Sequence, residues 1–188
     1  MKLCIDPGHG NSNRKNGVYD PGATYGKDTE ADIVLQWALT GKWVAKERGI
    51  PVFLTRDDDS DPTPVSTRDN RAEQAGCTHF LSLHCNAANG KAHGTETFYR
   101  DTQDKALAQQ VQQAALQALD LRDRGLKSEA ASQHNQLAIF DFNGPAALLE
   151  LGFIDASAEL APDRGRLKDR DRRVAFWRNL FNTLEGKG

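Results

Sequence analysis

Two histidines and a glutamate occupy places where α/β proteins collect chemistry. His9 lies in a Pro-Gly-His-Gly turn after an apolar run, His84 ends a second apolar run, and Glu150 stands near the end of a third. In an open α/β sheet, ligands and catalytic groups gather at the carboxyl ends of the strands. Three strand ends that each present a group able to bind zinc or move a proton indicate a metal-dependent hydrolase.

A catalytic zinc site typically takes three ligands from His, Asp and Glu and leaves a fourth position for water. His9 and His84 are the natural imidazole pair, and the third ligand should be a carboxylate at the same edge of the sheet. Glu30 opens the first predicted helix, directly after the long loop that follows His9. We therefore expect Glu30 as the third ligand. The alternative is a glutamate that only complements the helix dipole, an effect worth about 0.3–1 kcal/mol.

Glu150 interrupts residues 146–153, which are otherwise apolar or glycine. A carboxylate in such surroundings is costly to ionise, so either its pKa rises or it finds a cation. One interpretation is a buried acid paired with an arginine or a lysine. The other is a general base and acid beside a metal-bound water, for which a pKa raised toward neutrality is favourable.

Further candidates lie close to these residues in the sequence or in predicted loops. Asn86 follows His84 by two residues, on the same side of an extended chain, and could hydrogen-bond a substrate or a ligand. His134 could stabilise a substrate oxyanion if the loop 121–136 folds over the cleft. Cys85 is a possible thiol nucleophile, but strand alternation directs its side chain away from that of His84.

Other polar residues are assigned to structure rather than to chemistry. His79 begins its strand and belongs at the opposite edge of the sheet, and His93 lies in a predicted loop. Residues 57–61 resemble a calcium-binding loop only in their charge. They lack the ligand spacing of an EF-hand, so we expect them at the surface.

Strand-like and helix-like patterns alternate along the chain and predict one α/β domain with a mostly parallel sheet and helices on both faces. Strands are expected over residues 2–6, 51–55, 79–84, 94–100, 137–140 and 146–151, and helices over 30–48, 66–75, 107–119 and 171–184. Long loops are expected over 11–29, 57–65 and 121–136. A length of 188 residues suits a single core, and neither a repeat nor a second domain is evident.

Charge and composition narrow the class of protein. The chain has 24 basic and 26 acidic residues, and a net charge of −2 gives no reason to expect a nucleic-acid partner. One local exception, residues 163–173, holds six Lys or Arg against three Asp. We expect a solvated helix start or loop there, and contact with an anionic polymer is the alternative. Cys4, Cys77 and Cys85 form no CxxC pair, so a disulfide scaffold is not expected.

No apolar run is long enough to span a bilayer, and the chain reaches its first strand without a signal-peptide pattern. The sequence therefore predicts a protein that is made in the cytoplasm and is not inserted into a membrane, unless another system exports it. We expect it to be a monomer.

An ordered series of motifs runs along nearly the whole chain. They are Ile5-Asp6-Pro7-Gly8-His9-Gly10, Asp20-Pro21-Gly22-Ala23, Glu30, Leu54-Thr55-Arg56 with Asp59, then Arg68 and Ala72, and residues 80–87, 94–99, 124–127 and 145–154. On these motifs the chain resembles the zinc-dependent N-acetylmuramoyl-L-alanine amidases of the type-3 amidase family, which are peptidoglycan hydrolases. It differs from many relatives at Asp155-Ala156, where they carry Ser-Asn, a difference in a turn and not in the chemistry.

The resemblance implies zinc ligation by His9, Glu30 and His84, with Glu150 as the catalytic acid–base. It also implies a sheet of about six mostly parallel strands. The implied substrate is bacterial peptidoglycan, cleaved at the amide that joins the lactyl group of N-acetylmuramic acid to L-alanine of the stem peptide. Lys127 and arginines near the cleft could then pair with stem-peptide carboxylates.

A catalytic domain without a leader, a wall-binding module or an autoinhibitory insertion resembles a phage or prophage endolysin, which acts on the wall after release by a holin. One rival reading keeps the zinc but cleaves a peptide, as a carboxypeptidase or endopeptidase. Another is a non-catalytic wall-binding or regulatory domain, which is disfavoured because all four functional groups are present. A phosphate cradle at residues 7–10 is disfavoured as well, because neither a GxGxxG motif nor a P-loop lysine is present.

Overall fold

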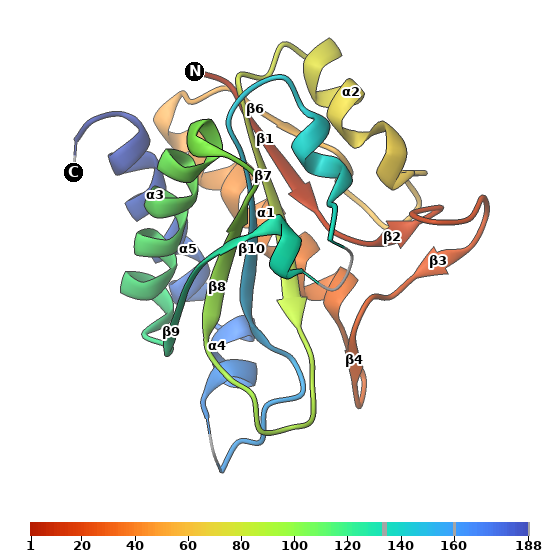
Figure 1. Cartoon of the computed structure of the whole chain (residues 1–188), viewed down its shortest axis with the longest axis vertical. Coiled ribbons are helices and arrows are strands. Elements are labelled where there is room, and N and C mark those ends of the chain that lie inside the picture. The colour runs from red at the N-terminus through yellow and green to blue at the C-terminus, as the bar shows by residue number, and fades with distance from the viewer. Residues whose placement is uncertain (133–134, 160, 188) are drawn as a thin grey trace.

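The computed structural model describes residues 1–132, 135–159 and 161–187, which form an α/β fold around a six-stranded sheet. In spatial order the strands are β6 (Val52–Leu54), β1 (Leu3–Pro7), β7 (His79–Asn86), β10 (Ala146–Phe153), β8 (Thr95–Tyr99) and β9 (Asp123–Ser128). Neighbouring strands run parallel except β8 and β10, which are antiparallel. The predicted mostly parallel sheet is confirmed (Figure 1).

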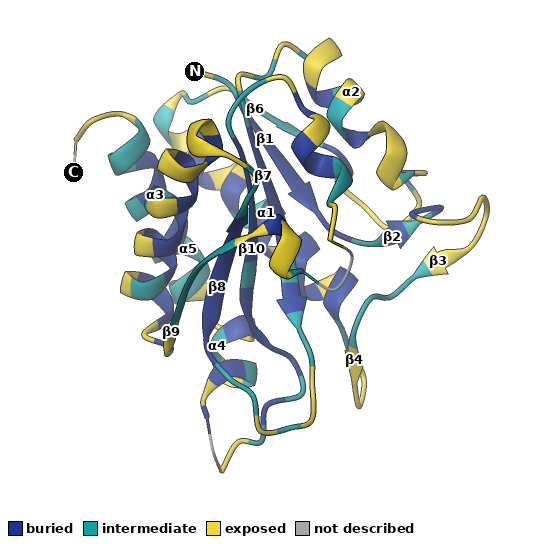
Figure 2. Cartoon of the chain, in the orientation of Figure 1, coloured by how far each residue is buried: buried dark blue, intermediate teal, exposed yellow. Residues whose placement is uncertain are grey.

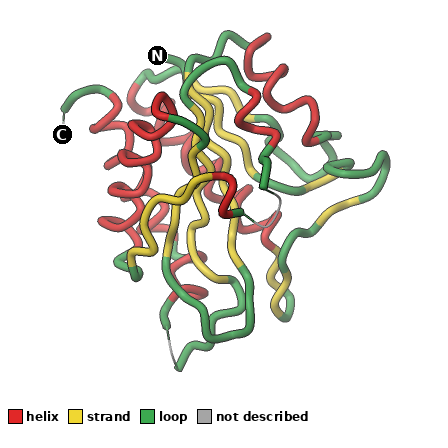
Figure 3. Tube along the Cα trace, in the orientation of Figure 1, coloured by secondary structure: helices red, strands yellow, loops and turns green. Residues whose placement is uncertain are grey.

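Helices cover both faces of this sheet, as the ribbon and the tube both show (Figures 1 and 3). One face carries α1 (Glu30–Arg48), α3 (Thr102–Leu119) and α5 (Arg170–Leu184), with the short α4 (Asp163–Lys168) leading into α5. The other face carries α2 (Arg68–Gln74) and three 3-10 helices, Val65–Thr67, Glu129–Ala131 and Ala138–Asp141.

The central strands β1, β7, β10 and β8 are largely buried between these layers, whereas the edge strands β6 and β9 are only partly buried (Figure 2). The larger apolar core lies under α1, α3 and α5, and a smaller one around Phe80 lies under α2 and the last 3-10 helix. Cys4, Cys77 and Cys85 are free thiols, as expected. None of the helices in the described part of the chain is long and apolar enough to cross a membrane.

Helix α1 begins and ends at the residues that its sequence signals indicate. The hydroxyl of Thr29 accepts a hydrogen bond from an amide of the first turn, and Gly49, with φ 68°, ends the helix. A Cβ at Gly41 would lie 2.5 Å from the ring of Trp177, so a glycine there lets α1 and α5 pack closely. The cap at Thr29 makes Glu30 the first residue of α1.

Two small hairpins return the chain from β1 to α1, within the segment predicted as a long loop. They pair β2 (Gly10–Asn11) with β3 (Tyr19–Asp20), and β4 (Thr24–Tyr25) with β5 (Asp28–Thr29). They place His9 and Glu30 at the same end of the sheet, although 21 positions separate the two residues in the sequence.

Besides these hairpins, two further predictions of secondary structure are wrong. The expected strand over residues 137–140 is a 3-10 helix, because the consecutive apolar residues Ile139 and Phe140 both pack into the smaller core instead of alternating between faces. Strand β9 falls within the predicted loop 121–136, and its polar sequence gave no apolar alternation because it is an edge strand with half-exposed residues.

The basic run 163–173 forms α4 and the first turn of α5, as a helix start was predicted. Arg166 donates to the carbonyl oxygen of Leu119 over 2.7 Å, and Arg172 donates to that of Ala118 over 2.8 Å. These guanidinium groups satisfy carbonyls at the end of α3, which have no partner within their own helix. Part of the charge of this run is therefore used inside the fold.

Candidate active site

The turn after β1 carries His9 in an unusual backbone conformation. His9 has φ 62°, in the left-handed region that non-glycine residues rarely adopt. Residue 8 must be glycine, because a Cβ there would lie 2.4 Å from His84 Cε1. The turn therefore brings the backbone of β1 directly against the ring of His84.

Two buried arginines hold this turn. Arg68 donates to the carbonyl oxygen of His9 over 2.7 Å and to Asp6 Oδ1 over 2.8 Å. Arg56 donates to the carbonyl oxygen of Gly8 over 2.9 Å and to that of Ala31, in the first turn of α1, over 2.8 Å. The guanidinium of Arg56 therefore binds both the strained turn and the start of α1.

Asp6 completes this buried network, since its carboxylate also accepts hydrogen bonds from Ser82 and Thr55. Burial by itself would raise the pKa of Asp6, but the Arg68 charge and the two hydroxyls outweigh it and lower the pKa. Asp6 is therefore ionised in the folded protein at neutral pH.

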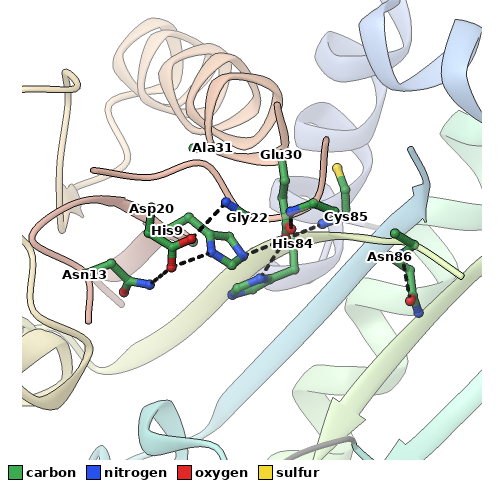
Figure 4. Close-up of polar contacts among 12 residues, drawn as sticks. His9, Asn13, Asp20, Gly22, Glu30, Ala31, His84, Cys85 and Asn86 are labelled. Atoms are coloured by element: carbon green, nitrogen blue, oxygen red, sulfur yellow. Dashed lines mark hydrogen bonds and ion pairs between the residues drawn. The ribbon is translucent and has the colours of Figure 1, made fainter. Parts of the chain in front are cut away.

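His9, Glu30 and His84 meet around one point, as the close-up shows (Figure 4). Glu30 Oε1 lies 3.0 Å from His9 Nε2 and 2.9 Å from His84 Nδ1, and the centroids of the two imidazole rings are 4.9 Å apart. One ligand atom from each residue lies within 4.8 Å of the others. Two imidazoles and a carboxylate are the donor set of many catalytic zinc sites, so these residues fit a divalent metal ion.

Asp20 orients the imidazole of His9 from the side away from Glu30 (Figure 4). Its Oδ2 lies 3.1 Å from His9 Nδ1 and accepts from Asn13 Nδ2 over 2.6 Å, while Oδ1 accepts from the Gly22 amide over 3.0 Å. Partial burial works against ionisation, but these hydrogen bonds lower the pKa of Asp20 to about 2. Such a carboxylate fixes the tautomer of a metal-binding histidine.

The electrostatics of the three side chains favour a negative carboxylate between two imidazoles. Burial alone would raise the pKa of Glu30, but its hydrogen bonds to His84 and His9 lower it strongly. Burial lowers the pKa of His9, yet its contacts with Glu30 and Asp20 raise it on balance. Glu30 also accepts hydrogen bonds from the amides of Cys85 and Ala23, each over 2.9 Å. Its carboxylate is thus held in place from several sides.

Glu150 stands beside this cluster. It is paired in register with His84 on β7 and with Glu96 on β8. Glu150 Oε2 is shielded from solvent and has no hydrogen-bond partner among the described residues, nor does Glu150 form an ion pair with any of them. Burial, and then the charges of Glu30 and Glu96, raise its pKa well above the ordinary value. The alternative of a buried acid paired with arginine or lysine therefore finds no support in the described residues.

A cleft of about 640 Å³ connects these groups. His9, Glu30, His84 and Glu150 all line it. Beyond Glu150 the cleft has a polar side, lined by Asn86, Glu96, Arg124 and Phe153, and a more apolar side, lined by Val65, Phe98, Leu137, Ile139 and Leu148.

The other candidates from the sequence occupy different places. Asn86 lines the cleft and donates to Glu96 Oε1 over 3.0 Å. Lys127 is half-buried on β9 and is not among the described residues that line the cleft. His134 lies outside the described residues. Cys85 is buried in the larger core and His79 lies at the opposite end of β7, in agreement with the structural roles predicted for both.

The acidic loop is at the surface, as expected. Asp57, Asp58 and Asp61 bring carboxylates together, but Asp58 and Asp61 accept hydrogen bonds from amides of their own loop and Asp57 pairs with Lys42. This loop needs no ion to account for it.

Sequence reasoning missed the residues that support the site. Asp20 stands in the Asp-Pro-Gly motif, and Arg56, Arg68, Glu96 and Arg124 also belong to the motif series, but the sequence assigns no individual role to any of these residues. A charged residue next to an apolar strand was the available signal, but it did not reveal which partner each of them would meet.

In this α/β domain, two histidines and a glutamate meet around one point at the carboxyl edge of the sheet. Beside them lies a glutamate whose Oε2 is shielded from solvent and has no partner among the described residues. These features are typical of metal-dependent hydrolases. The sequence narrows this class. Residues 3–181 match the family described as N-acetylmuramoyl-L-alanine amidase, and the chain belongs to that family.

Relatives and solved structures agree with this assignment. The chain is 33% identical over 174 residues to an uncharacterised cell wall amidase of Bacillus anthracis, and 32% identical over 190 residues to the sporulation-specific N-acetylmuramoyl-L-alanine amidase of Bacillus subtilis. These matches cover 84% and 98% of this chain, and 30% and 67% of the two relatives. The catalytic domain of CwlV, an N-acetylmuramoyl-L-alanine amidase of Bacillus (Paenibacillus) polymyxa var. colistinus, superposes with a TM-score of 0.82 at 27% identity, over 100% of this chain and 99% of that domain.

Proposed function

We propose that this chain is a zinc-dependent amidase that cleaves peptidoglycan between N-acetylmuramic acid and L-alanine of the stem peptide. The observation that carries the proposal is the arrangement of His9, Glu30 and His84 around one point, beside which Glu150 Oε2 is buried and has no hydrogen-bond partner in the described part of the chain. The family supports the amide as the bond cleaved. The donor set supports zinc as the metal.

His9, Glu30 and His84 would hold the ion, and Asp20 would keep the ring of His9 in the required tautomer. A bound zinc ion supplies Lewis acidity and lowers the pKa of a water to about 7. Glu150 takes the proton of the attacking water, because its burial and its acidic neighbours give it a high proton affinity. It then passes this proton to the amine of L-alanine as the amide bond breaks.

Product analysis tests the bond cleaved. Purified sacculi are digested with the zinc-loaded protein, and the soluble products are identified by mass spectrometry. An amidase releases intact stem peptides with a free L-alanine amine and leaves the glycan without peptide. A zinc peptidase would shorten the peptide and leave L-alanine on the muramic acid, which would contradict the proposal. A non-catalytic wall-binding domain would release neither product.

We further propose that the protein acts in cell lysis. In this role it would bind peptidoglycan as a monomer. Production of the protein in the bacterial cytoplasm should leave cells intact until the inner membrane is permeabilised, for instance by a co-expressed holin. The optical density should then fall rapidly, but not with the Glu150→Gln variant. Lysis without permeabilisation would contradict the release step.

A further inference from the structure

The polar side of the cleft contains an organised group that the proposed chemistry does not use. Glu96 is 5% exposed, and its two carboxylate oxygens bind two different residues. Oε1 accepts from Asn86 Nδ2 over 3.0 Å, and Oε2 accepts from Arg124 Nε over 2.8 Å. The guanidinium of Arg124 also lies over the ring of Phe153, 4.9 Å from its centroid. We call Asn86, Glu96, Arg124 and Phe153 the arginine platform.

Backbone geometry holds Arg124 in this position. Gly94, with φ 107°, begins the turn into β8, and a Cβ there would lie 2.4 Å from the carbonyl oxygen of Arg122 and 3.0 Å from Arg124 Cγ. A glycine therefore lets the backbone before β8 approach the stem of Arg124. Together with the ring of Phe153 and the carboxylate of Glu96, this contact fixes the direction of the guanidinium.

The terminal nitrogens of Arg124 are available to a ligand. Only Nε is engaged by Glu96, and among the described residues Nη1 and Nη2 have no hydrogen-bond partner. Arg124 lines the cleft, and its side chain is 30% exposed. A guanidinium presents its donors in a planar fork that matches a carboxylate with two parallel hydrogen bonds.

The other described cations that line the cleft are placed differently. Arg68 is buried, and its nitrogens donate to Asp6, to the turn of His9, and to Thr63 and Asn13. Arg14 lies on the His9 side of the cleft, where it faces Asp20 at 3.5 Å. Arg124 is therefore the described cation that faces the cleft on the β8–β9 side of Glu150.

The distance from Glu150 indicates which part of a substrate would reach this platform. Glu150 pairs with His84 and Phe153 pairs with Asn86, and these partners are two positions apart on β7, which corresponds to about 7 Å along a strand. An extended peptide that starts at the cleaved amide covers this distance with its first two or three residues. The acidic side chains of Glu30, Glu96 and Glu150 disfavour a second anion in this part of the cleft. A substrate carboxylate therefore needs a cation beside it.

We infer that Arg124 binds a carboxylate of the stem peptide, two or three residues from the cleaved bond, and thereby makes this enzyme prefer stem peptides whose carboxylate is free over those in which it is amidated. The inference rests on the proposed function, because it takes the stem peptide as the ligand. Arg124 acts as a specificity residue and takes no part in the proton transfers of Glu150.

Two synthetic substrates test it, both with the γ-carboxyl group of their D-glutamate residue blocked as an N-methylamide. In one, N-acetylmuramoyl-L-alanyl-D-glutamate, the α-carboxylate is free. In the other, its isoglutamine counterpart, that α group is an amide. The wild type should show a kcat/KM about tenfold higher on the acid, mainly through a lower KM. Arg124→Gln should lose about tenfold on the acid and less than about threefold on the amide, so that the preference disappears. Arg124→Lys should retain part of it, because a lysine keeps the charge without the fork.

Arg122→Gln is the matched control, since Arg122 carries the same charge two positions earlier and is exposed. It should preserve the ratio between the two substrates. Equal kcat/KM values of the wild type on both substrates would overturn the inference. Equal losses on both substrates in Arg124→Gln would do so as well, because they would show that Arg124 only neutralises Glu96.

Binding of both compounds to the zinc-loaded Glu150→Gln protein, measured by titration calorimetry, separates this inference from the proposed function. A preference for the acid that Arg124→Gln removes supports the inference even if the wild type cleaves neither compound. Absence of cleavage with that binding preference intact would count against the proposed amidase activity alone. Equal binding of the acid and the amide would overturn the role of Arg124.

Discussion

His84 and Glu150 are direct neighbours across strands β7 and β10. A candidate metal ligand and a candidate proton carrier are therefore placed by the register of two adjacent central strands, not by a flexible loop. Glu30 reaches the same point from the first turn of α1. Substitutions of single residues can therefore separate metal binding, proton transfer and the contacts that hold the metal ligands in place.

Glu150→Gln should abolish turnover and leave the metal in place. The amide keeps the volume of the side chain but cannot take up a proton, and proton transfer by a positioned group is typically worth about 10²–10⁴-fold in rate. We expect a loss of this size on purified sacculi, with one zinc per chain by elemental analysis. Substantial remaining activity would show that another group carries the proton.

His84→Ala should instead lose the metal, because it removes one of three protein ligands. The zinc content of the purified protein should fall well below one per chain, and activity should fall with it. His79→Ala is the matched control, since His79 lies on the same strand at the opposite end of the sheet. Full zinc occupancy in His84→Ala would exclude His84 as a ligand.

Asp20→Asn should weaken zinc binding and keep the fold. The variant loses the charge that fixes His9 Nδ1, and loss of such a supporting group typically costs about 10–100-fold in metal affinity. Competition with a chromophoric chelator at neutral pH measures this change. An unchanged affinity would mean that the tautomer of His9 is set without Asp20.

Gly8→Ala should displace the ring of His84, because the added Cβ would lie 2.4 Å from Cε1. We expect reduced zinc content and reduced activity with little change in secondary structure by circular dichroism. Gly165→Ala makes the same substitution where no atom lies within 4 Å and should leave both quantities unchanged. Normal zinc content in Gly8→Ala would show that the turn can move away.

Asp6→Asn should destabilise the metal-free protein at neutral pH by about 3–5 kcal/mol, because it leaves the buried charge of Arg68 without its counterion. The folded pKa of Asp6 lies below its ordinary value of 3.8, so the ionised carboxylate stabilises the fold above about pH 4. This contribution is lost as the pH falls through the lowered folded pKa. The difference in the free energy of unfolding between wild type and variant should therefore shrink in acid.

Urea titrations at pH 7 and at about pH 3 measure this difference. Glu47→Gln removes an exposed carboxylate and should change stability by less than about 0.5 kcal/mol at either pH. A difference between wild type and Asp6→Asn that stays constant across the two pH values would contradict an ionised Asp6 in the buried network.

The positions of the proposed site residues in the fold could be predicted because local patterns set them. His84 and Glu150 stand on buried apolar strands, and the cap at Thr29 fixes Glu30 at a helix start, so apolar periodicity and a capping signal were sufficient to place them. The backbone φ of His9 and the contact of Asp20 with its ring depend on two hairpins that the sequence presented as one long loop.

Strand β9 escaped prediction for a related reason. Its residues are only partly buried at the edge of the sheet, and its pairing with β8 shifts register near Arg124. Neither property produces a periodic pattern of apolar residues in the sequence. The arginine platform becomes visible only when β9 is placed beside β8, because its four members come from separate segments of the chain.

Two of the three carbonyl groups to which Arg56 donates belong to Gly8 and Ala31, each a direct neighbour in sequence of a proposed metal ligand. The turn and the helix start can therefore shift only as a unit, so the coordinating atoms are prearranged before any ion arrives. After a chelator has removed the metal, the binding site should accordingly remain formed. The protein should then regain full activity within the mixing time when the metal ion is added back.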